Sequence, residues 1–270
     1  MGLVIGVCRG DVADPNPLMM IEGSGNLEID PAQVGAVLLA AGLASRMRGI
    51  VKQLLRIDGE PLVGRTLRVL CEAGIGQVVV VTGHQAEAIE SALVNDFPDC
   101  GARMSSEVHA DASRVMERNS KPTVRIKRNP DYLVGQQSSV LCGLQALPVQ
   151  TDPVLVVLGD LALLQAQDIR ELLSAFAQRA PGKRILVPRF RGQRGNPVVV
   201  ERTIVDQVIN QRDPRNGLRG FIDAHRDLVA SSEVSNDHYV FDLDTPSDIL
   251  VLESKLGRAV AGWDRTAFIE

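Results

Sequence analysis

The chain has 270 residues and a formal net charge of −4, with 29 Lys and Arg residues against 33 Asp and Glu residues. Hydrophobic residues make up 45% of it, which is ordinary for a globular protein and enough for one large α/β domain. The charge balance and an aromatic content of 3% argue against a nucleic-acid partner. No run approaches the ~20 apolar residues of a membrane span, so we expect no membrane partner. Four cysteines without metal-ligand spacing indicate reduced thiols in a cytoplasmic protein.

Residues 1–32 are rich in Gly and Pro, and we expect them to form a loosely structured extension. The first regular pattern of apolar residues begins after them. Three continuous apolar runs then predict fully buried strands, and segments with helical periodicity lie between them. In chain order the predicted elements are strand Val34–Ala40, helix Pro61–Ala73, strand Gln77–Val81, helix Ala86–Val94, strand Val124–Lys127, helix Ser138–Leu147, strand Val154–Leu158, helix Gln167–Ala177, strands Ile185–Val187 and Val198–Val200, helices Thr203–Ile209 and Leu218–Ala224, strand Tyr239–Leu243 and helix Pro246–Leu256.

The alternation of strands and helices predicts an α/β fold, with a Rossmann-like, mostly parallel sheet and helices on both faces. The shorter elements of the second half favour an antiparallel part there. We expect this domain to span residues 33–256, with a polar insertion at about 100–121 that is an excursion from the sheet or a disordered loop. Residues 257–270 would form a C-terminal tail.

In such a sheet, ligands bind beyond the carboxyl ends of the strands, so the first candidate site is the loop after Val34–Ala40. Its small residues would let the backbone approach a nucleotide, and free amides there bind phosphates. Arg46 and Lys52 add two cations, as a triphosphate requires. Because both sit in a loop, we expect their side chains to have little packing to lose. The alternative is a plain turn carrying two solvated basic residues.

Carboxylates follow two other predicted strands. Asp160 comes directly after the strand Val154–Leu158, where it would hold Mg²⁺ or, alternatively, act as a turn or N-cap residue. Asp242 and Asp244 lie two residues apart, so in an extended strand they would point the same way and supply a further metal ligand. The alternative is that Asp244 or Thr245 caps the helix that begins at Pro246.

Residues 34–256 carry an ordered set of short motifs. They are Leu39–Met47, Lys52–Leu55, Gly59–Leu62, Thr82–His84, Asn129–Asp131, Gly135–Val140, Gly159–Asp160, Arg194–Val198, Gly217–Arg219 and Asp242–Pro246. This ordered set resembles the molybdenum cofactor cytidylyltransferase family, a branch of the nucleotidyltransferases of the nucleotide-diphospho-sugar transferase type. The related guanylyltransferases and methylerythritol-phosphate cytidylyltransferases belong to the same group. Ala41 favours the cytidylyl branch, because the guanylyltransferases usually carry a second Gly there.

The resemblance implies transfer of CMP from CTP to the phosphate of molybdopterin, with Mg²⁺ as cofactor and pyrophosphate as the second product. It implies that Arg46, Lys52 and Asp160 are catalytic, and that Asp160 holds the metal with Asp242 or Asp244. Asn196 and Arg219 would bind the acceptor. The implied nucleotide-binding residues are Leu39, Ala40, Ala41, Gly42, Ser45, Thr82, Gly83, Ser138, Ser139 and Gly159.

Two departures from the family pattern keep other functions open. The segment from Arg46 to Lys52 is one residue longer than usual and has Val51 in place of Pro, and Leu161-Ala162 replace a polar residue and Pro after Asp160. One alternative is therefore nucleotidyl transfer to a sugar or polyol phosphate. The other is a non-catalytic protein that binds the nucleotide or pterin and delivers it to a molybdoenzyme.

Overall fold

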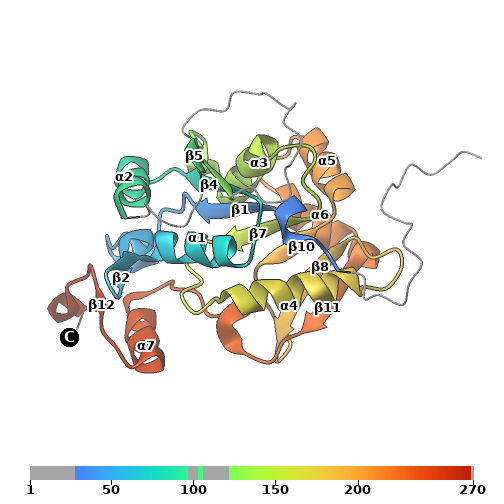
Figure 1. Ribbon diagram of the computed structural model, residues 1–270. Helices are drawn as coiled ribbons and strands as arrows, with labels where there is room; N and C mark the ends of the chain where they lie inside the picture. The colour runs from blue at the N-terminus through green and yellow to red at the C-terminus, as the bar shows by residue number, and fades with distance from the viewer. Residues whose placement is uncertain (1–27, 97–102, 106–121, 269–270) are drawn as a thin grey trace, which may run out of the picture.

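The computed structural model describes residues 28–96, 103–105 and 122–268 (Figure 1). Most of the predicted extension and of the predicted insertion therefore lies outside the described residues. Within the described part, Pro31–Gln33 already forms a 3₁₀ turn (η1), and Arg103–Ser105 forms a strand (β5). The remaining 3₁₀ turns are η2 (Ser45–Met47), η3 (Lys52–Leu54), η4 (Tyr132–Val134), η5 (Arg226–Leu228), η6 (Asp237–Tyr239) and η7 (Arg265–Phe268).

The centre of the molecule is one large sheet. Strands β7, β1, β4, β6 and β5 run parallel, whereas β10 is antiparallel to both of its neighbours and β11 is parallel to β8. This arrangement confirms the mostly parallel sheet and the antiparallel part. In sheet order the strands are β11 (Val229–Glu233), β8 (Ile185–Phe190), β10 (Val198–Val200), β7 (Val154–Leu158), β1 (Gly35–Ala40), β4 (Gln77–Thr82), β6 (Thr123–Arg128) and β5, and the short β9 (Gln193–Arg194) pairs with β8.

Helices cover both faces of this sheet, as predicted. Along β1, Ala36 and Leu38 belong to one apolar cluster, and Val37 and Leu39 belong to the other, because successive residues of a strand point to opposite faces. Figure 1 shows α1 and α4 on the lower side of β1 and α3 and α5 on its upper side. The first cluster includes α1 (Leu62–Glu72), α2 (Ala86–Asp96) and α4 (Ala166–Ala177), and the second includes α3 (Gln136–Ala146), α5 (Arg202–Gln211) and α6 (Gly217–Ala224).

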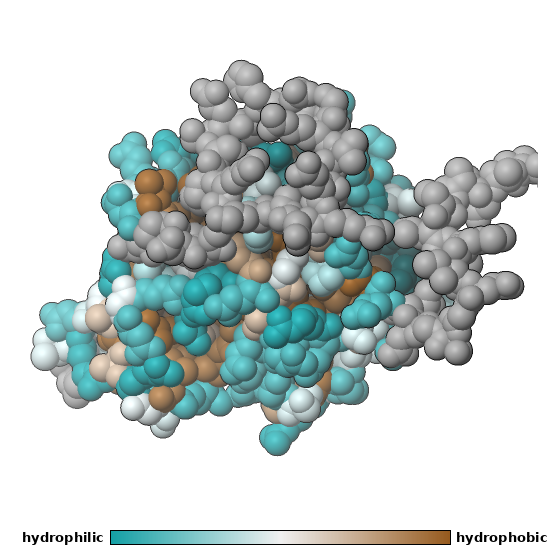
Figure 2. Space-filling view, in the orientation of Figure 1, coloured by the Kyte–Doolittle hydropathy of each residue, from teal (hydrophilic) through white to brown (hydrophobic). Residues whose placement is uncertain are grey.

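A smaller unit closes one end of the molecule. Strands β2 (Arg56–Ile57), β3 (Glu60–Pro61) and β12 (Val260–Ala261) form a second sheet, which shares an apolar cluster with α7 (Pro246–Leu256). Figure 2 shows apolar surface around α7 at the lower left, where α7 carries two half-exposed aliphatic residues. In the described part of the chain no helix is long and apolar enough to span a bilayer.

At the edge of the large sheet one predicted strand is absent and one strand was not predicted. Tyr239–Leu243 is not a strand, because Asp237–Tyr239 turns as η6 and the following residues are irregular. Tyr239 is instead drawn inward, where its hydroxyl donates to the carbonyl of Asp168. The free edge of β8 is taken by β11, a half-exposed strand whose sequence, Val-Ala-Ser-Ser-Glu, carries too weak an apolar signal to predict it.

The topology fixes where a ligand would bind. After β1, the chain adds β4 and then β6 on one side, and it later returns to place β7 on the other side of β1. The order of strands therefore reverses between β1 and β7, and open α/β sheets bind their ligands beyond the carboxyl ends of the strands at such a point. The segment after Ala40 and the pair Gly159-Asp160 both start there.

Candidate active site

The segment after β1 has an exposed stretch held between buried ends. Ala41 is buried against Gly83, the residues from Gly42 to Arg46 are largely exposed, and the side chain of Met47 is fully buried. A Cβ atom added to Gly42 would meet nothing within 4 Å, so packing does not require glycine at this position. This stretch, which includes Ser45, leaves open space beside the end of β1, as a bound nucleotide needs.

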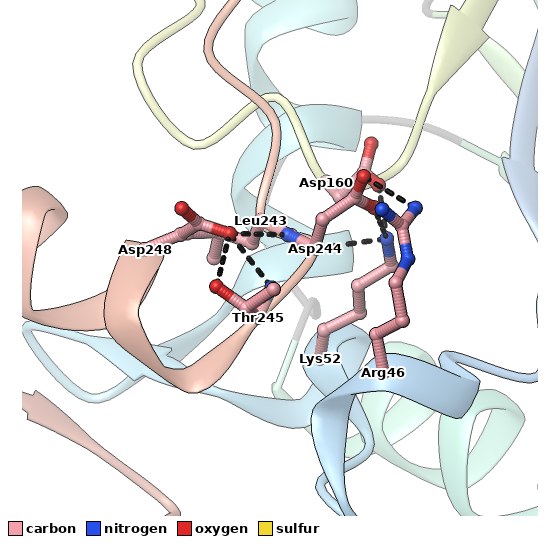
Figure 3. A network of polar contacts seen from close by, with 7 residues as sticks. All are labelled: Arg46, Lys52, Asp160, Leu243, Asp244, Thr245 and Asp248. Carbon is pink, nitrogen blue, oxygen red and sulfur yellow. Dashed lines mark hydrogen bonds and ion pairs between the residues drawn. The ribbon is translucent and has the colours of Figure 1, made fainter.

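Lys52 reaches the end of β7 in spite of the lengthened loop. It begins η3, and its ammonium group donates one hydrogen bond to Oδ2 of Asp160 and another, 2.9 Å long, to the carbonyl oxygen of Leu243 (Figure 3). The side chains of Lys52 and Asp160 are each only 11% exposed. The expectation that Lys52 has little packing to lose is therefore wrong. Its partners come from segments far along the chain, which a local sequence pattern does not reveal.

The carboxylate of Asp160 is only half satisfied. While Oδ2 accepts from Lys52, Oδ1 is buried and has no hydrogen-bond partner among the described residues. A buried carboxylate oxygen without a donor is costly, and a cation would satisfy it. Among the described residues no group of three or more His, Cys, Asp or Glu side chains is arranged to hold a metal ion. Mg²⁺ fits such a place, because it is usually held by one or two carboxylates, substrate phosphates and water.

Asp244 links the second cation to this centre. Its carboxylate accepts a 2.6 Å hydrogen bond from Arg46, whose side chain is 68% exposed, and lies 3.5 Å from the ammonium of Lys52. The helix cap falls to the next residue, since Thr245 and Asp248 form a capping box at the start of α7. This supports the capping alternative for Thr245 and leaves the carboxylate of Asp244 facing the two cations (Figure 3).

Asp242 stands at the rim of the same centre. The expected strand geometry is absent, so Asp242 and Asp244 are not a matched pair on one strand face. Asp242 is exposed by surface area, but desolvation by the surrounding protein raises the pKa of its carboxyl group, and the carboxylates of Asp160 and Asp244 raise it further. This crowding of negative charge would be relieved by a divalent cation.

Three of the predicted nucleotide-binding side chains are engaged within the fold. The hydroxyl of Thr82 donates to Glu90 on α2, and the hydroxyls of Ser138 and Ser139 both accept from the side-chain amide of Asn129. All three residues are buried. They hold the ends of β4 and α3 in position, so any direct contact with a nucleotide here would come from the backbone. The sequence pattern did not reveal this supporting role, and nucleotide binding by these segments stays a prediction.

Two glycines of the candidate site are required for close packing. A Cβ atom on Gly159 would lie 2.6 Å from the carbonyl oxygen of Leu39, and one on Gly83 would lie 2.7 Å from the Cβ of Tyr132. Glycine therefore lets the ends of β1, β4 and β7 approach one another. The unusual Leu161-Ala162 pair after Asp160 is buried in the apolar core, so these residues shape the packing beneath Asp160.

A cavity of about 250 Å³ opens beside this centre, on the face of the sheet covered by α3 and α6. Leu39 and Leu158, near the carboxyl ends of β1 and β7, line it, and so do the two predicted acceptor-binding residues, Asn196 and Arg219. Arg194 lines the cavity too, although the motif Arg194–Val198 alone predicts no role for its side chain. The other lining residues are Gln136, Gln137, Val140, Val156, Val198, Leu218 and Ile222.

Comparison with known proteins agrees with this geometry. A family profile described as the MobA-like NTP transferase domain matches residues 36–229, which contain β1, β7 and the cavity. The chain belongs to the MobA-like NTP transferase family. A curated relative, the bifunctional protein GlmU of Kineococcus radiotolerans, is 28% identical over 84% of this chain. The matched part spans only 39% of that relative's length.

Solved structures share the fold of this MobA-like NTP transferase. Rv0371c of Mycobacterium tuberculosis H37Rv, in its complex with manganese, gives a TM-score of 0.56 at 21% identity and covers 82% of this chain and 97% of its own. The 4-diphosphocytidyl-2C-methyl-D-erythritol synthase of Anaerococcus prevotii gives 0.59 at 14% identity, over 87% of this chain and 100% of its own. At these identities the likeness shows the fold alone.

Proposed function

We propose that the protein transfers CMP from CTP to the phosphate group of a small acceptor and releases pyrophosphate. The observation that carries this proposal is the half-satisfied carboxylate of Asp160, which lies at the end of β7 with Lys52 on one oxygen and the other free. Family membership supports the nucleotidyl transfer, and the cytidylyl fold relative supports CTP. The role of Ala41 in choosing cytosine over guanine rests on the sequence resemblance.

The chemistry needs charge neutralisation and positioning more than covalent catalysis. An oxygen of the acceptor phosphate attacks the α-phosphorus of CTP, a new phosphorus–oxygen bond forms, and the bond to the bridging oxygen breaks. Pyrophosphate leaves with the bonding electrons. Because the acceptor phosphate is already an anion, no side chain has to remove a proton. Arg46 and Lys52 would stabilise the negative charge that grows on the phosphate oxygens.

A divalent cation fits this site. Asp160, through its free Oδ1, and Asp244 would hold it, with Asp242 as the neighbouring carboxylate. When bound, the cation would supply positive charge to the phosphate oxygens of CTP. The manganese complex of the fold relative supports a divalent metal, and we propose Mg²⁺ as the physiological ion.

The cavity lined by Asn196 and Arg219 is the proposed acceptor site. It combines aliphatic walls with arginines, a chemistry suited to an anionic group on an apolar or aromatic body. Molybdopterin has this character and is the acceptor implied by the sequence resemblance, so we propose it first. Sugar and polyol phosphates remain the alternative acceptors.

The test is a panel of nucleoside triphosphates with Mg²⁺ or Mn²⁺, scored for binding by calorimetry and for pyrophosphate release with each acceptor. We expect CTP to bind more tightly than GTP, and pyrophosphate release to require an acceptor phosphate. Asp160→Asn serves as the inactive control. Equal or tighter binding of GTP would overturn the cytidylyl assignment, and CTP binding without turnover on any acceptor would favour a non-catalytic delivery protein.

A further inference from the structure

A second cavity adjoins the proposed acceptor site. It measures about 320 Å³, and it shares Arg194 and Ile222 with the first cavity, so the two meet at these side chains. It lies toward β8 and β11 rather than toward the proposed CTP site. Its remaining lining residues are Val187, Arg189, Asp223, Arg226, Val229 and Ser231.

The charges around the joined cavities do not balance. Four arginines line them, Arg189, Arg194, Arg219 and Arg226, against the single carboxylate of Asp223. That carboxylate lies 3.5 Å from Arg194, which is 36% exposed on its side chain. In the described part of the chain, neither Arg219 nor Arg226 forms an ion pair.

One of these arginines is held in place without a carboxylate, and a second is partly buried among the others. Arg189 donates to the hydroxyl of Ser231 and to the carbonyl of Gly192, which fixes its guanidinium at the rim of the second cavity. Burial lowers the pKa of Arg194, and the positive charges of Arg219 and Arg189 lower it further, whereas Asp223 acts in the opposite direction. Cations gathered in this way are typical of a place that receives an anion.

We propose that the second cavity binds a second anionic group of the acceptor, on the end remote from the phosphate that receives CMP. Arg189, Arg194 and Arg226 surround that group, and Ile222 lies beneath the part of the acceptor that joins the two cavities. The acceptor is therefore a molecule with anionic groups at both ends, of the phosphate or carboxylate class. This inference favours a sugar or polyol phosphate that carries a second anionic group over molybdopterin, whose single phosphate is the group that receives CMP. This proposal rests on the proposed function for the role of the first cavity.

The spacing of the strands indicates how long such an acceptor has to be. Asp160 follows β7, and the second cavity lies over β8 and β11, two and three strands away in the order β7, β10, β8, β11. With neighbouring strands about 4.8 Å apart, the remote group sits roughly 10–14 Å from the end of β7. A compact monophosphate is too short to reach both ends.

Direct binding tests this inference without requiring turnover. We would titrate the full-length protein by calorimetry with alkanediol bisphosphates of graded chain length and with the matching alkyl monophosphates. One bisphosphate length is expected to bind at least about tenfold more tightly than its monophosphate, because a charged hydrogen bond to a guanidinium contributes that much. Arg226→Gln should remove the advantage, because it takes away a guanidinium group that lines the second cavity.

Arg191→Gln is the matched control. Arg191 lies on the same hairpin as Arg194, over the ring of Phe190, and lines neither cavity, so its loss removes one positive charge without touching the site. The bisphosphate advantage should survive in this variant. Equal affinity for bisphosphates and monophosphates, or an advantage that Arg226→Gln preserves, would overturn the inference even if CMP transfer is observed. An Arg226-dependent advantage without CMP transfer would uphold the anion site and refute the proposed function.

Discussion

The ammonium group of Lys52 donates to Oδ2 of Asp160 across 108 residues of sequence, while Oδ1 of that carboxylate is buried without a partner among the described residues. Lys52 thus neutralises the charge of Asp160 and leaves one oxygen for a cation. The pair holds the segment after β1 against the end of β7, and the free Oδ1 is the atom that the proposed cation would bind.

Asp160→Asn separates metal binding from structure. The substitution keeps the shape of the side chain but removes the charge that would bind the metal, so turnover should fall by about 10²–10³-fold. The buried ammonium of Lys52 loses its closest anion, so the melting temperature should also fall modestly, because the carbonyl of Leu243 and Asp244 still face it. Activity against Mg²⁺ concentration, with melting curves in its absence, checks both effects. Normal activity with an unshifted Mg²⁺ curve would contradict the metal role.

Lys52→Ala and Arg46→Ala should differ in stability but agree in activity. Lys52→Ala leaves the buried carboxylate of Asp160 uncompensated, which costs about 3–5 kcal/mol of unfolding free energy. Arg46→Ala breaks an exposed pair with Asp244 worth only about 0–1 kcal/mol. Each variant should lose turnover.

Urea unfolding measures the stability of the Lys52 and Arg46 variants, and pyrophosphate release measures their turnover. Restoring neutrality with the double variant Lys52→Met/Asp160→Asn should recover part of the lost stability. If Lys52→Ala proves as stable as Arg46→Ala, the buried pair of Lys52 and Asp160 does not stabilise the fold.

Gly42→Ala and Gly159→Ala form a matched test of the candidate nucleotide loop. A methyl group on Gly42 meets open space, so the melting temperature should not change, whereas CTP should bind at least about tenfold more weakly if the loop contacts it. A methyl group on Gly159 would collide with the backbone of Leu39 and should destabilise the protein by about 1–3 kcal/mol. Calorimetry with CTP and thermal melting give both readouts. Unchanged CTP affinity in Gly42→Ala would exclude this loop from the nucleotide site.

Glu90→Gln tests the hydrogen bonds that Glu90 forms with Thr82 and Arg128, because the stability that they contribute should depend on pH. Hydrogen bonding to Arg128 lowers the pKa of Glu90, and the bond from Thr82 lowers it further, although burial acts in the opposite direction. A lowered pKa means that the charged form stabilises the fold above the ordinary value of 4.5, and that this contribution is lost as the pH falls through the folded-state pKa.

The wild-type protein should therefore exceed Glu90→Gln in stability by less than about 1 kcal/mol at pH 7, because the pair is partly exposed. The difference should shrink below pH 4.5. Urea unfolding across this range measures it, and in an Arg128→Gln background the same substitution should show a weaker pH dependence. A difference that stays constant with pH would show that the Glu90 charge contributes nothing.

The sequence predicted the fold best where a strand is marked by its own continuous run of apolar residues. β1, β4 and β7 are continuous apolar runs, and their order along the chain is enough to predict that Asp160 and the loop after β1 meet at one edge of the sheet. The family motifs also single out Asn196 and Arg219, and both line one cavity, while their role in binding the acceptor stays a prediction.

The features that the sequence did not reveal depend on contacts between different secondary-structure elements. The burial of Lys52 follows from Asp160 and Leu243, and the hydroxyl of Thr82 is engaged by a glutamate one helix away. The strand β11 pairs with β8 through its backbone, so its side chains can be small and polar. Each of these features is fixed by tertiary contacts that local periodicity does not record.

The pairing of Arg46 with Asp244 spans 198 residues and has a consequence for synthesis of the protein. A chain emerging from the ribosome presents Arg46 and Lys52 first, Asp160 later and Asp244 last. The charged centre therefore cannot assemble until the chain has been made beyond Asp244, and contacts of such large sequence separation are slow to form. Incomplete chains would hold the exposed loop without the carboxylates that complete it, so they should neither retain metal nor consume nucleotide.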